Sequence, residues 1–530
     1  MGTIGKPPFA PPTAQTDSVS AKSKKITGYW VLAVTILGAS MAYIDGTAVN
    51  VALPALQDQL GATIVDMQWV IEAYSLFLAS LILVGGALGD RYGRRLIYGV
   101  GIALFAFASI LCGLSENVTE LIYFRALQGI GGALMIPGSL AIITVFFDES
   151  ERGKAIGTWG AFSAITTAIG PVLGGWLVEE VSWRWIFFIN IPIAVIALFL
   201  LFWRVPESKG ELAKCKIDYW GALLATLGLG AVIFGLIESA ALGFNDPVVY
   251  GSICLGILSL VTFVVVEHKV EAPMVPLKLF RSRTFSGANI VTLLMYAPLA
   301  GLMFFLPFAM IQVFDYTVTG AGASFMPVII LLFVFSRWSG GLVDTYGAKL
   351  PLVFSNIIQA VGYALFALLG GEGNYFYTFF PGMFVLGLGL ALGVAPLTTA
   401  VMNAVDIAFS GTGSGINHTM ARVSGLVAIA ILGIIMLFLF SSGMDNGMRL
   451  HDIPQEVQEA FKVEYIKLAD ADMPLGISPE IEQKLVNLVK LSYVKSFNIL
   501  MYIAAGLCLL SALIAWVMVS DEKRYQKDRQ

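Results

Sequence analysis

The sequence GGALGDRYGRR, from Gly85 to Arg95, places glycines and four charged residues directly after a long apolar stretch. A second run, SGGLVDTYGAK from Ser339 to Lys349, repeats the pattern in another apolar setting. The matching pairs are Gly86 with Gly340, Asp90 with Asp344, Tyr92 with Tyr346, Gly93 with Gly347, and Arg95 with Lys349. Each run follows one apolar segment and opens the next. The chain is therefore predicted to contain a parallel repeat of six-helix units, a pattern typical of transporters.

The composition places the chain in the membrane. Of its 530 residues, 57% are hydrophobic and only 13% are charged, whereas about 25% is usual in soluble domains. The formal net charge is −4, so nothing suggests a nucleic-acid partner. The four cysteines and three histidines have no metal-ligand spacing, and no protease motif lies on the apolar segments. We expect an all-α membrane protein that is not an enzyme and holds no metal.

Fourteen apolar segments are long enough to span a bilayer, which takes about 20 residues each. They lie near 27–51, 67–89, 96–115, 119–147, 155–179, 185–204, 218–238, 248–267, 285–312, 320–343, 351–370, 376–400, 421–442 and 497–519. The predicted organisation is a disordered tail (1–26), a six-helix bundle (27–204), a linker with two extra spans (205–284), a second six-helix bundle (285–519) and a C-terminal tail (520–530).

The charges of the loops predict the orientation. Basic residues gather in alternate loops and in the C-terminal tail, and the loops between them are short and nearly free of Lys and Arg. Short loops rich in Lys and Arg stay in the cytoplasm. We expect a multi-pass protein of the bacterial inner membrane with both termini in the cytoplasm. The polar loop 443–496 falls on the other side, where it forms either a small helical cap or a solvated linker.

The glycine runs carry charges that a simple loop does not need. Small residues let helices approach closely, and basic residues favour the C-terminal end of a helix. Asp90 is instead expected to bind a helix N-terminus of the other half, which would make a latch that forms in one state and breaks in another. The latch residues are Gly86, Asp90, Arg91, Gly93, Arg94, Arg95, Asp344 and Gly347. The alternative is a basic loop that only sets topology.

Three charged residues lie inside predicted spans, where such residues are expensive and usually functional. Asp45, Glu72 and Arg125 all lie five or six residues inside the same ends of their helices, about 8–9 Å deep at 1.5 Å per residue. Because they share this depth in one bundle, we expect them to contact one another. Burial disfavours a carboxylate's charged form and a nearby arginine favours it. We therefore interpret Asp45 as a proton-coupling carboxylate modulated by Arg125. A permanent structural ion pair is the alternative, and Glu72 is a second proton candidate, a solvated residue or an attractor of cations.

Several stretches resemble one family. GALGDRYGRR resembles the signature between the second and third helices of the major facilitator superfamily, and LIYFRALQGIGGA, which includes Arg125, resembles its fourth-helix motif. GPVLGGWL, with Gly170, Pro171, Gly174 and Gly175, is similar to the fifth-helix motif associated with antiporters. YIDGTAVNVALP and GSGINHTMARVSG resemble the fourteen-helix drug:proton antiporters. The second half departs from the pattern, because Met383 stands at the position that matches Arg125.

The resemblance implies fourteen helices in two six-helix bundles with two inserted helices, and a proton-coupled exporter of amphipathic or cationic organic compounds. It implies the proton gradient as energy source in place of a cofactor. The expected partners are the substrate, protons and the bilayer, with a periplasmic adaptor as a further candidate, and the family expectation is a monomer. Asn417 and Arg422 match the family pattern as gating candidates, although Arg422 could instead reach lipid headgroups. An exporter of a single metabolite or siderophore and a transport-dead sensor are the alternatives.

Overall fold

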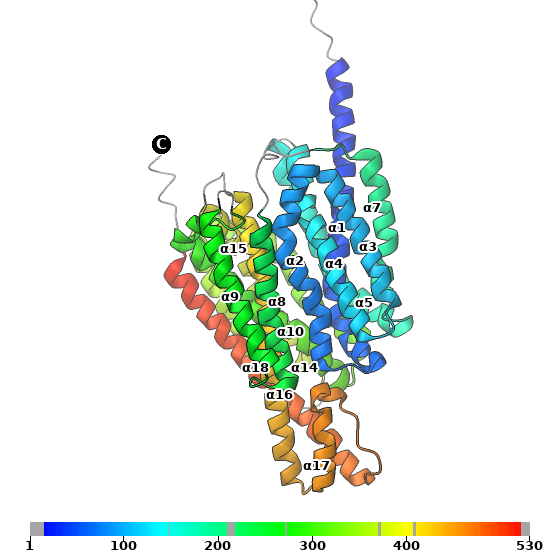
Figure 1. Ribbon diagram of the computed structural model, residues 1–530. Coiled ribbons are helices and arrows are strands. Elements are labelled where there is room, and N and C mark those ends of the chain that lie inside the picture. The colour runs from blue at the N-terminus through cyan, green and yellow to red at the C-terminus, as the bar shows by residue number, and fades with distance from the viewer. Residues whose placement is uncertain are drawn as a thin grey trace, which may run out of the picture.

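The computed structural model describes residues 15–147, 149–208, 218–270, 273–368, 373–405 and 410–520, and these contain helices and no β-strand. Fourteen of the helical stretches are long and apolar enough to cross a membrane, and each coincides with one of the fourteen predicted spans. The all-α membrane architecture expected from the sequence is therefore confirmed. The duplication predicted from the two glycine runs corresponds to two bundles placed side by side (Figure 1).

The first bundle comes from the N-terminal part of the chain. It contains α1 (Gln15–Leu60), α2 (Ile64–Tyr92), α3 (Arg94–Leu114), α4 (Val118–Phe146) and α5 (Glu149–Glu180), and α6 (Trp185–Phe188) with α7 (Asn190–Arg204) as the sixth span. α1 begins inside the segment predicted to be a disordered tail, and it ends nine residues beyond the predicted residue 51. Residues 1–14 lie outside the described part of the chain.

The second bundle begins after a short 3-10 helix, η1 (Leu277–Arg281). It contains α10 (Arg283–Phe308) with the π-helical turn η2 (Ala309–Val313), α11 (Val318–Ala323) with α12 (Met326–Tyr346), and α13 (Lys349–Phe366). α14 (Tyr375–Thr378) with α15 (Phe380–Asn403), α16 (Ser410–Leu450) and α18 (Pro479–Met518) complete it. The last two helices continue well past their predicted spans, which ended at 442 and began at 497.

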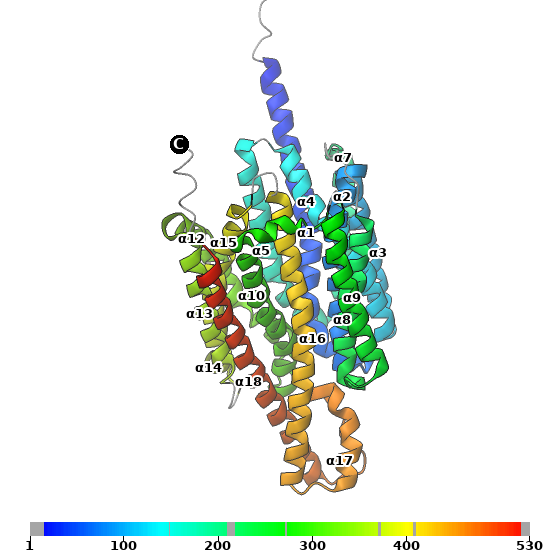
Figure 2. The same ribbon diagram turned by 60° about the vertical axis from the view of Figure 1, so that its left-hand side comes forward.

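Two additional helices, α8 (Tyr219–Leu242) and α9 (Pro247–Lys269), connect the bundles. α8 packs against α2 of the first bundle and α16 of the second, and α9 packs on α8 (Figure 2). The indole Nε1 of Trp69 on α2 donates a hydrogen bond to Glu238 on α8 at 3.0 Å. α9 leaves apolar side chains such as Leu255, Leu258 and Val261 exposed, as a helix that faces lipid does. The inserted pair thus covers one seam between the halves.

Residues 443–496 form a helical cap rather than an extended linker. The ends of α16 and α18 extend beyond the bundle and hold α17 (Gln455–Lys462) and the 3-10 segment η4 (Val463–Asp470) between them (Figure 1). Phe461, Tyr465 and Leu485 are buried within the cap. Both ends of the described chain lie at the opposite end of the molecule. We call the two ends the cap face and the terminal face.

The cap contacts both halves. Nε2 of Gln57, at the end of α1, donates to the carbonyl oxygen of Lys467 in η4 at 3.0 Å, and Gln312 of η2 donates to the Gln57 side chain at 3.3 Å. Because α16 and α18 belong to the second bundle, this contact joins the halves at the cap face. Asp470, at the end of η4, lies near Asp58 of α1. Burial, together with the charges of Asp58 and Asp472, raises the pKa of Asp470 to about 6, against the opposing effect of Lys467.

We expect docking of the cap on α1 to weaken as the pH rises from about 4 to about 6. The pKa of Asp470 is above its ordinary value of 3.8 in the docked cap, so ionisation costs docking free energy across that window. A cysteine pair replacing Gln57 and Lys467 should therefore cross-link faster at pH 5 than at pH 7.5, after correction for thiol reactivity measured with a free thiol probe. Asp470→Asn should abolish this dependence, and Glu482→Gln, an exposed carboxylate on α18, should retain it. An unchanged pH profile in Asp470→Asn would assign the effect to another group.

Candidate functional site

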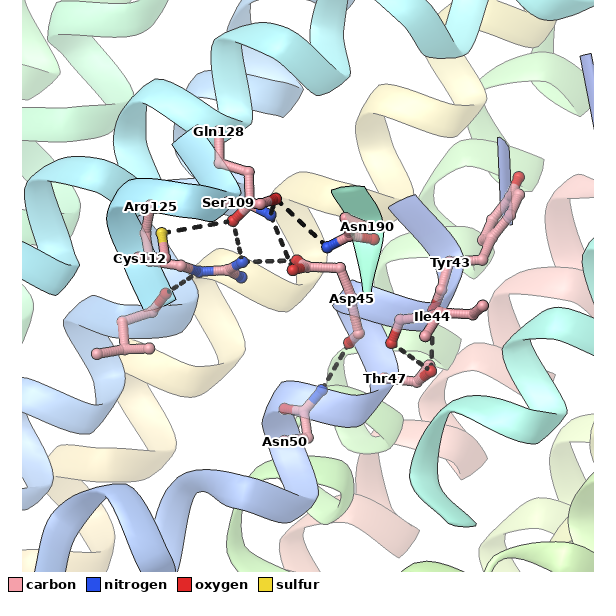
Figure 3. A network of polar contacts seen from close by, with 12 residues as sticks. Tyr43, Ile44, Asp45, Thr47, Asn50, Ser109, Cys112, Arg125, Gln128 and Asn190 are labelled. Carbon is pink, nitrogen blue, oxygen red and sulfur yellow. Dashed lines mark hydrogen bonds and ion pairs between the residues drawn. The ribbon is translucent and has the colours of Figure 1, made fainter. Parts of the chain in front are cut away.

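A buried ion pair joins α1 to α4. Nη1 of Arg125 lies 2.6 Å from Oδ2 of Asp45, and both side chains are inaccessible to solvent. Figure 3 shows the guanidinium pointing from α4 directly at the carboxylate of α1. Asp45 and Arg125 are thus brought together as their similar predicted depth suggested. Their role in proton coupling remains a prediction.

The ion pair is embedded in hydrogen bonds on both sides. Gln128 Nε2 donates to Oδ1 of Asp45 at 2.8 Å, and its Oε1 accepts from Arg125 Nη1 at 2.6 Å. Arg125 Nε donates to the carbonyl oxygen of Val70 on α2 at 3.0 Å, and the guanidinium lies 4.4 Å from the centre of the Tyr74 ring. A buried ion pair is stable only when its remaining donors and acceptors are satisfied in this way.

Sequence reasoning missed the polar residues that complete this network. Gln128 also donates to Ser109 Oγ on α3 at 2.9 Å, and Asn190 Nδ2 on α7 donates to the same hydroxyl at 3.3 Å (Figure 3). One signal was available, because Gln128 follows Arg125 by three residues and shares its helix face. Ser109 and Asn190 are single polar residues in apolar helices, and no spacing within the sequence connects them with Asp45.

A glycine allows α2 to approach the site. A Cβ atom at Gly129 of α4 would lie 2.4 Å from the carbonyl oxygen of Tyr74 on α2, a distance that no side chain tolerates. The two helices therefore pack backbone to backbone one turn away from Arg125. This close approach places the Val70 carbonyl within reach of the guanidinium. The glycines of the fourth-helix motif thus position the charged site, in addition to packing the bundle.

Glu72 does not join the ion pair. It lies two residues after Val70, and residues two apart on a helix point in nearly opposite directions, so Val70 faces Arg125 while Glu72 faces away. Its side chain is fully buried, and neither carboxylate oxygen has a hydrogen-bond partner. The mutual contact expected of Asp45, Arg125 and Glu72 is therefore wrong for Glu72, because equal depth does not fix the direction in which a side chain points.

Glu72 instead lines a cavity of about 330 Å³ between the two halves. The first half contributes side chains from α1, α2 and α5, among them Thr47, Asn50 and Glu72. The second half contributes α10, α12, α15 and α16, with mostly apolar residues such as Met303 and Leu332. A largely apolar pocket with a few polar groups at a domain interface is the usual form of a small-molecule site. Asp45 lies directly beside it, since its chain neighbours Gly46 and Thr47 are part of the lining.

The two gating candidates of α16 are in different surroundings. Nδ2 of Asn417 donates to Thr292 at 2.6 Å and to Asn289 at 3.2 Å, both on α10 of the same bundle, so it does not bridge the halves. Arg422 lines the interface cavity and is half-buried. The alternative that Arg422 extends to lipid headgroups is therefore wrong.

The antiporter-motif residues of α5 pack against both halves. Gly170 and Gly174 lie against Thr47 and Ala48 of α1, where a Cβ would meet atoms within 1.9 and 2.7 Å. A Cβ at Gly175 would lie 2.6 Å from the carbonyl oxygen of Val318 on α11, in the other half. Pro171 contributes to the cavity lining. The bare face of α5 is therefore the surface on which the halves meet at the cap face.

The halves are not packed in the same way near the terminal face. Among the described residues, an added Cβ at Gly157 or Gly160 of α5, or at Gly340 of α12, would meet no atom within 4 Å. The exposed fractions of the neighbouring Phe162 and Trp338 are 47% and 57%. The structure is therefore closed at the cap face, and its halves are further apart at the terminal face.

The first glycine run makes contacts only within its own half. Arg94 Nη2 lies 2.6 Å from Asp90 Oδ1, one turn earlier in the run. The N-terminus of α3 is instead bound by Glu207, which follows α7 and accepts from the backbone NH of Arg95 at 3.0 Å and of Leu96 at 3.2 Å. Among the described residues, the expected contact of Asp90 with a helix start of the other half is absent from this state, because Arg94, one turn away, pairs with its carboxylate.

The other members of the run have distinct positions. Gly93 has φ +125°, and a Cβ there would lie 2.8 Å from the Glu207 carboxyl carbon, so a side chain at this position would strain the backbone and displace Glu207. Arg95 also donates to the Val205 carbonyl oxygen at 3.0 Å. Arg91 is exposed, and Gly86 lies beside Pro137 of α4. In the second run Gly347 also has positive φ, +75°, and the side chain of Asp344 lies outside the described residues.

Known proteins resemble this arrangement over most of its length. The sequence profile of the Major Facilitator Superfamily matches residues 35–429. The puromycin resistance protein pur8 of Streptomyces alboniger is 30% identical, over 93% of this chain and 92% of that protein. The multidrug resistance protein Stp of Mycobacterium tuberculosis is 31% identical, over 82% of this chain and 80% of Stp. A bacterial homologue of the human lysosomal transporter Spinster, solved in an inward-facing, unoccupied conformation, has the same fold, with a TM-score of 0.63 at 16% identity over 94% of this chain and 99% of that one.

Removing one charge of the buried ion pair should lower the free energy of unfolding more than removing both charges together. Arg125→Gln leaves an uncompensated buried carboxylate, which lowers the free energy of unfolding by about 3–5 kcal/mol. The double variant Asp45→Asn/Arg125→Gln removes both charges and should lose less than the sum of the single variants, measured as thermal unfolding of the purified protein. The exposed pair Lys490–Asp315 is the matched control, and its Gln and Asn variants should each cost less than about 1 kcal/mol. Additive losses at Asp45 and Arg125 would argue against direct coupling.

Substituting Gly175 should open the cap face. Gly175→Ala pushes a methyl group against the backbone of α11, so the closed arrangement is destabilised relative to one in which the halves separate there. A cysteine at Ile329, in the cavity lining, should then react faster with a membrane-impermeant maleimide added from the cap side, in a cysteine-free background. Gly506→Ala, where a Cβ meets no described atom within 4 Å, should leave that rate unchanged. Equal rates in both variants would contradict this account of the contact.

Proposed function

The chain belongs to the major facilitator superfamily, and on this premise we propose that it exports amphipathic or cationic organic compounds in exchange for protons. The observation that carries the proposal is the buried Asp45–Arg125 pair, 2.6 Å apart, beside a largely apolar cavity between two halves. Relatives named for resistance to puromycin and to multiple drugs, similar over most of both chains, support organic drugs as the class of substrate. The protein works as a transporter and not as an enzyme.

The ion pair supplies a means of coupling. Asp45 is on α1, which also lines the cavity through Gly46, Thr47 and Asn50, whereas Arg125 is held on α4 by the Val70 carbonyl and Gln128. Movement of α1 against α4 would lengthen the contact between guanidinium and carboxylate. The separated carboxylate then accepts a proton on Oδ2, and restoring the contact with Arg125 expels it. Gln128 can satisfy the guanidinium while Asp45 is neutral.

We assign the terminal face to the cytoplasm. Arg91, Arg94 and Arg95 lie there with both ends of the described chain, and short loops rich in Lys and Arg are retained on the cytoplasmic side. The structure then corresponds to a state that is closed toward the outside. Substrate would enter the cavity from the cytoplasm or the inner leaflet, and protons would reach Asp45 when the contact between Gly175 and α11 opens.

The remaining partners follow from this placement. The protein acts in the inner membrane as a monomer, because one chain contains both bundles and the whole cavity. A periplasmic adaptor would meet the cap, which extends from the second bundle at the end opposite the two ends of the described chain (Figure 1). No cofactor is required, since the proton gradient supplies the energy.

Ethidium efflux tests the proposed function. De-energised cells that express the chain should retain the dye and expel it once the proton gradient is restored. Asp45→Asn should reduce the gradient-dependent rate by about two orders of magnitude or more, because the residue can no longer carry a proton, and Asp45→Glu should restore part of it. In purified protein, substrate addition should release protons from the wild type and not from Asp45→Asn.

Glu482→Gln, in the exposed part of α18, is the control and should export as the wild type does. Gradient-dependent efflux that survives in well-expressed Asp45→Asn would move the proton site to another carboxylate. Absence of efflux from the well-expressed wild type, for ethidium and for a panel of drugs, would overturn export of drugs and favour an exporter of one metabolite.

A further inference from the structure

The interface cavity holds a carboxyl group and a guanidinium that are not paired with each other. Glu72 enters it from α2 of the first half and Arg422 from α16 of the second. No ion pair joins them in the described part of the chain, and neither belongs to the Asp45 network. The mechanism proposed above does not use either residue. Their presence in one mostly apolar cavity therefore needs a separate explanation.

The carboxyl group of Glu72 lacks hydrogen-bond partners among the described residues. Both of its carboxylate oxygens are buried and have no donor within reach, whereas Asp45 receives donors on both oxygens. A buried polar group without a partner costs about 1–3 kcal/mol, and more when it is charged. Such a cost is retained at a position that a ligand completes, and the partner that a carboxyl group lacks is a cation or a hydrogen-bond donor.

The guanidinium of Arg422 likewise lacks a charged partner in the described chain, but it offers donors where Glu72 offers acceptors. Its guanidinium carries up to five donors, and within the described residues no carboxylate forms an ion pair with it. Its neighbours in the cavity lining, Ala421, Gly425 and Leu426, are all small or apolar. The guanidinium therefore has room and unused donors on the cavity side. A planar fork of donors binds a carboxylate or a phosphate best.

The two charges are at different depths. α2 and α16 run antiparallel, since Gln68 bonds to the Ile429 carbonyl at 2.9 Å and a Cβ at Gly415 would lie 3.0 Å from Leu83. Interpolation between these contacts places the Arg422 backbone about one turn closer to the terminal face than that of Glu72, roughly 5 Å along the helix axis. One small molecule can reach both charges.

We propose that this cavity preferentially takes zwitterionic amphipathic molecules, with the cationic group on Glu72 and the anionic group on Arg422. The inference rests on the proposed export function and narrows its substrate class. Apolar side chains such as Leu299, Met303 and Leu332 bind the body of the molecule, and the cavity of about 330 Å³ suits a small drug-sized compound. A simple cation would satisfy Glu72 and leave Arg422 unpaired.

A matched pair of dyes tests the preference. A rhodamine with a free carboxyl group is a zwitterion, and its methyl ester is a cation with the same ring system. Fluorescence polarisation with the purified full chain should give a dissociation constant for the zwitterion at least about tenfold below that for the ester, as expected for one additional charged contact. Arg422→Gln should remove this difference by weakening the zwitterion alone, and Arg422→Lys should keep part of it. Glu72→Gln should weaken both dyes.

Arg449→Gln changes an exposed arginine of the same helix outside the cavity and should preserve the preference. Equal binding of the two dyes by the wild type, or a preference that persists in Arg422→Gln, would overturn the inference. The binding readout does not depend on transport. Gradient-driven ethidium efflux without a preference for the zwitterion would therefore leave the export function standing, whereas a preference without any efflux would leave the site and remove the function.

Discussion

The contact between Asp45 and Arg125 is the constraint on which the first half of the molecule depends. Two opposite charges in a low-dielectric interior must remain within hydrogen-bond distance, and every other donor and acceptor around them must be satisfied. That requirement fixes α1 against α4. It also explains the backbone contact at Gly129, which brings the Val70 carbonyl to the guanidinium, and the polar chain through Gln128 and Ser109 to Asn190. Apolar packing alone would not specify these positions.

The same helix links the ion pair to the cavity and to the closed face. α1 contributes Asp45 to the pair, its next two residues to the cavity lining, and Thr47 and Ala48 to the packing against Gly170 and Gly174 of α5. α5 in turn meets α11 of the other half through Gly175. Asp45 therefore lies on a helix that packs against the surface where the halves separate, and a change in its charge can act on that surface through α1. Coupling over such a short distance requires only rigid helices with two arrangements.

The polar residues near the cavity fall into two classes. Asp45 and Arg125 are paired and buried beside the cavity, whereas Glu72 of the first half and Arg422 of the second line the cavity and are not paired with each other. A buried charge is stabilised while its partner is in contact, whereas a buried polar group without a partner favours the binding of a ligand. A duplicated fold has thus acquired unequal chemistry: Met383 stands in the second half at the position that matches Arg125, and Arg422 takes a place in the cavity instead.

The sequence by itself determined the membrane class, the fourteen spans, the duplication and the family, because these depend on local hydropathy and on spacings along the chain. It also brought Asp45 and Arg125 to similar depths. The tertiary structure alone decided what each side chain faces: Glu72 turns into the cavity, Asp90 pairs with Arg94, and Glu207 binds the start of α3 within the same half. It also decided that Gln128, Ser109 and Asn190 complete the ion pair. Helical period and depth restrict where a side chain can lie, but the rotation and approach of neighbouring helices, set by packing at residues such as Gly129 and Gly175, decide which groups meet.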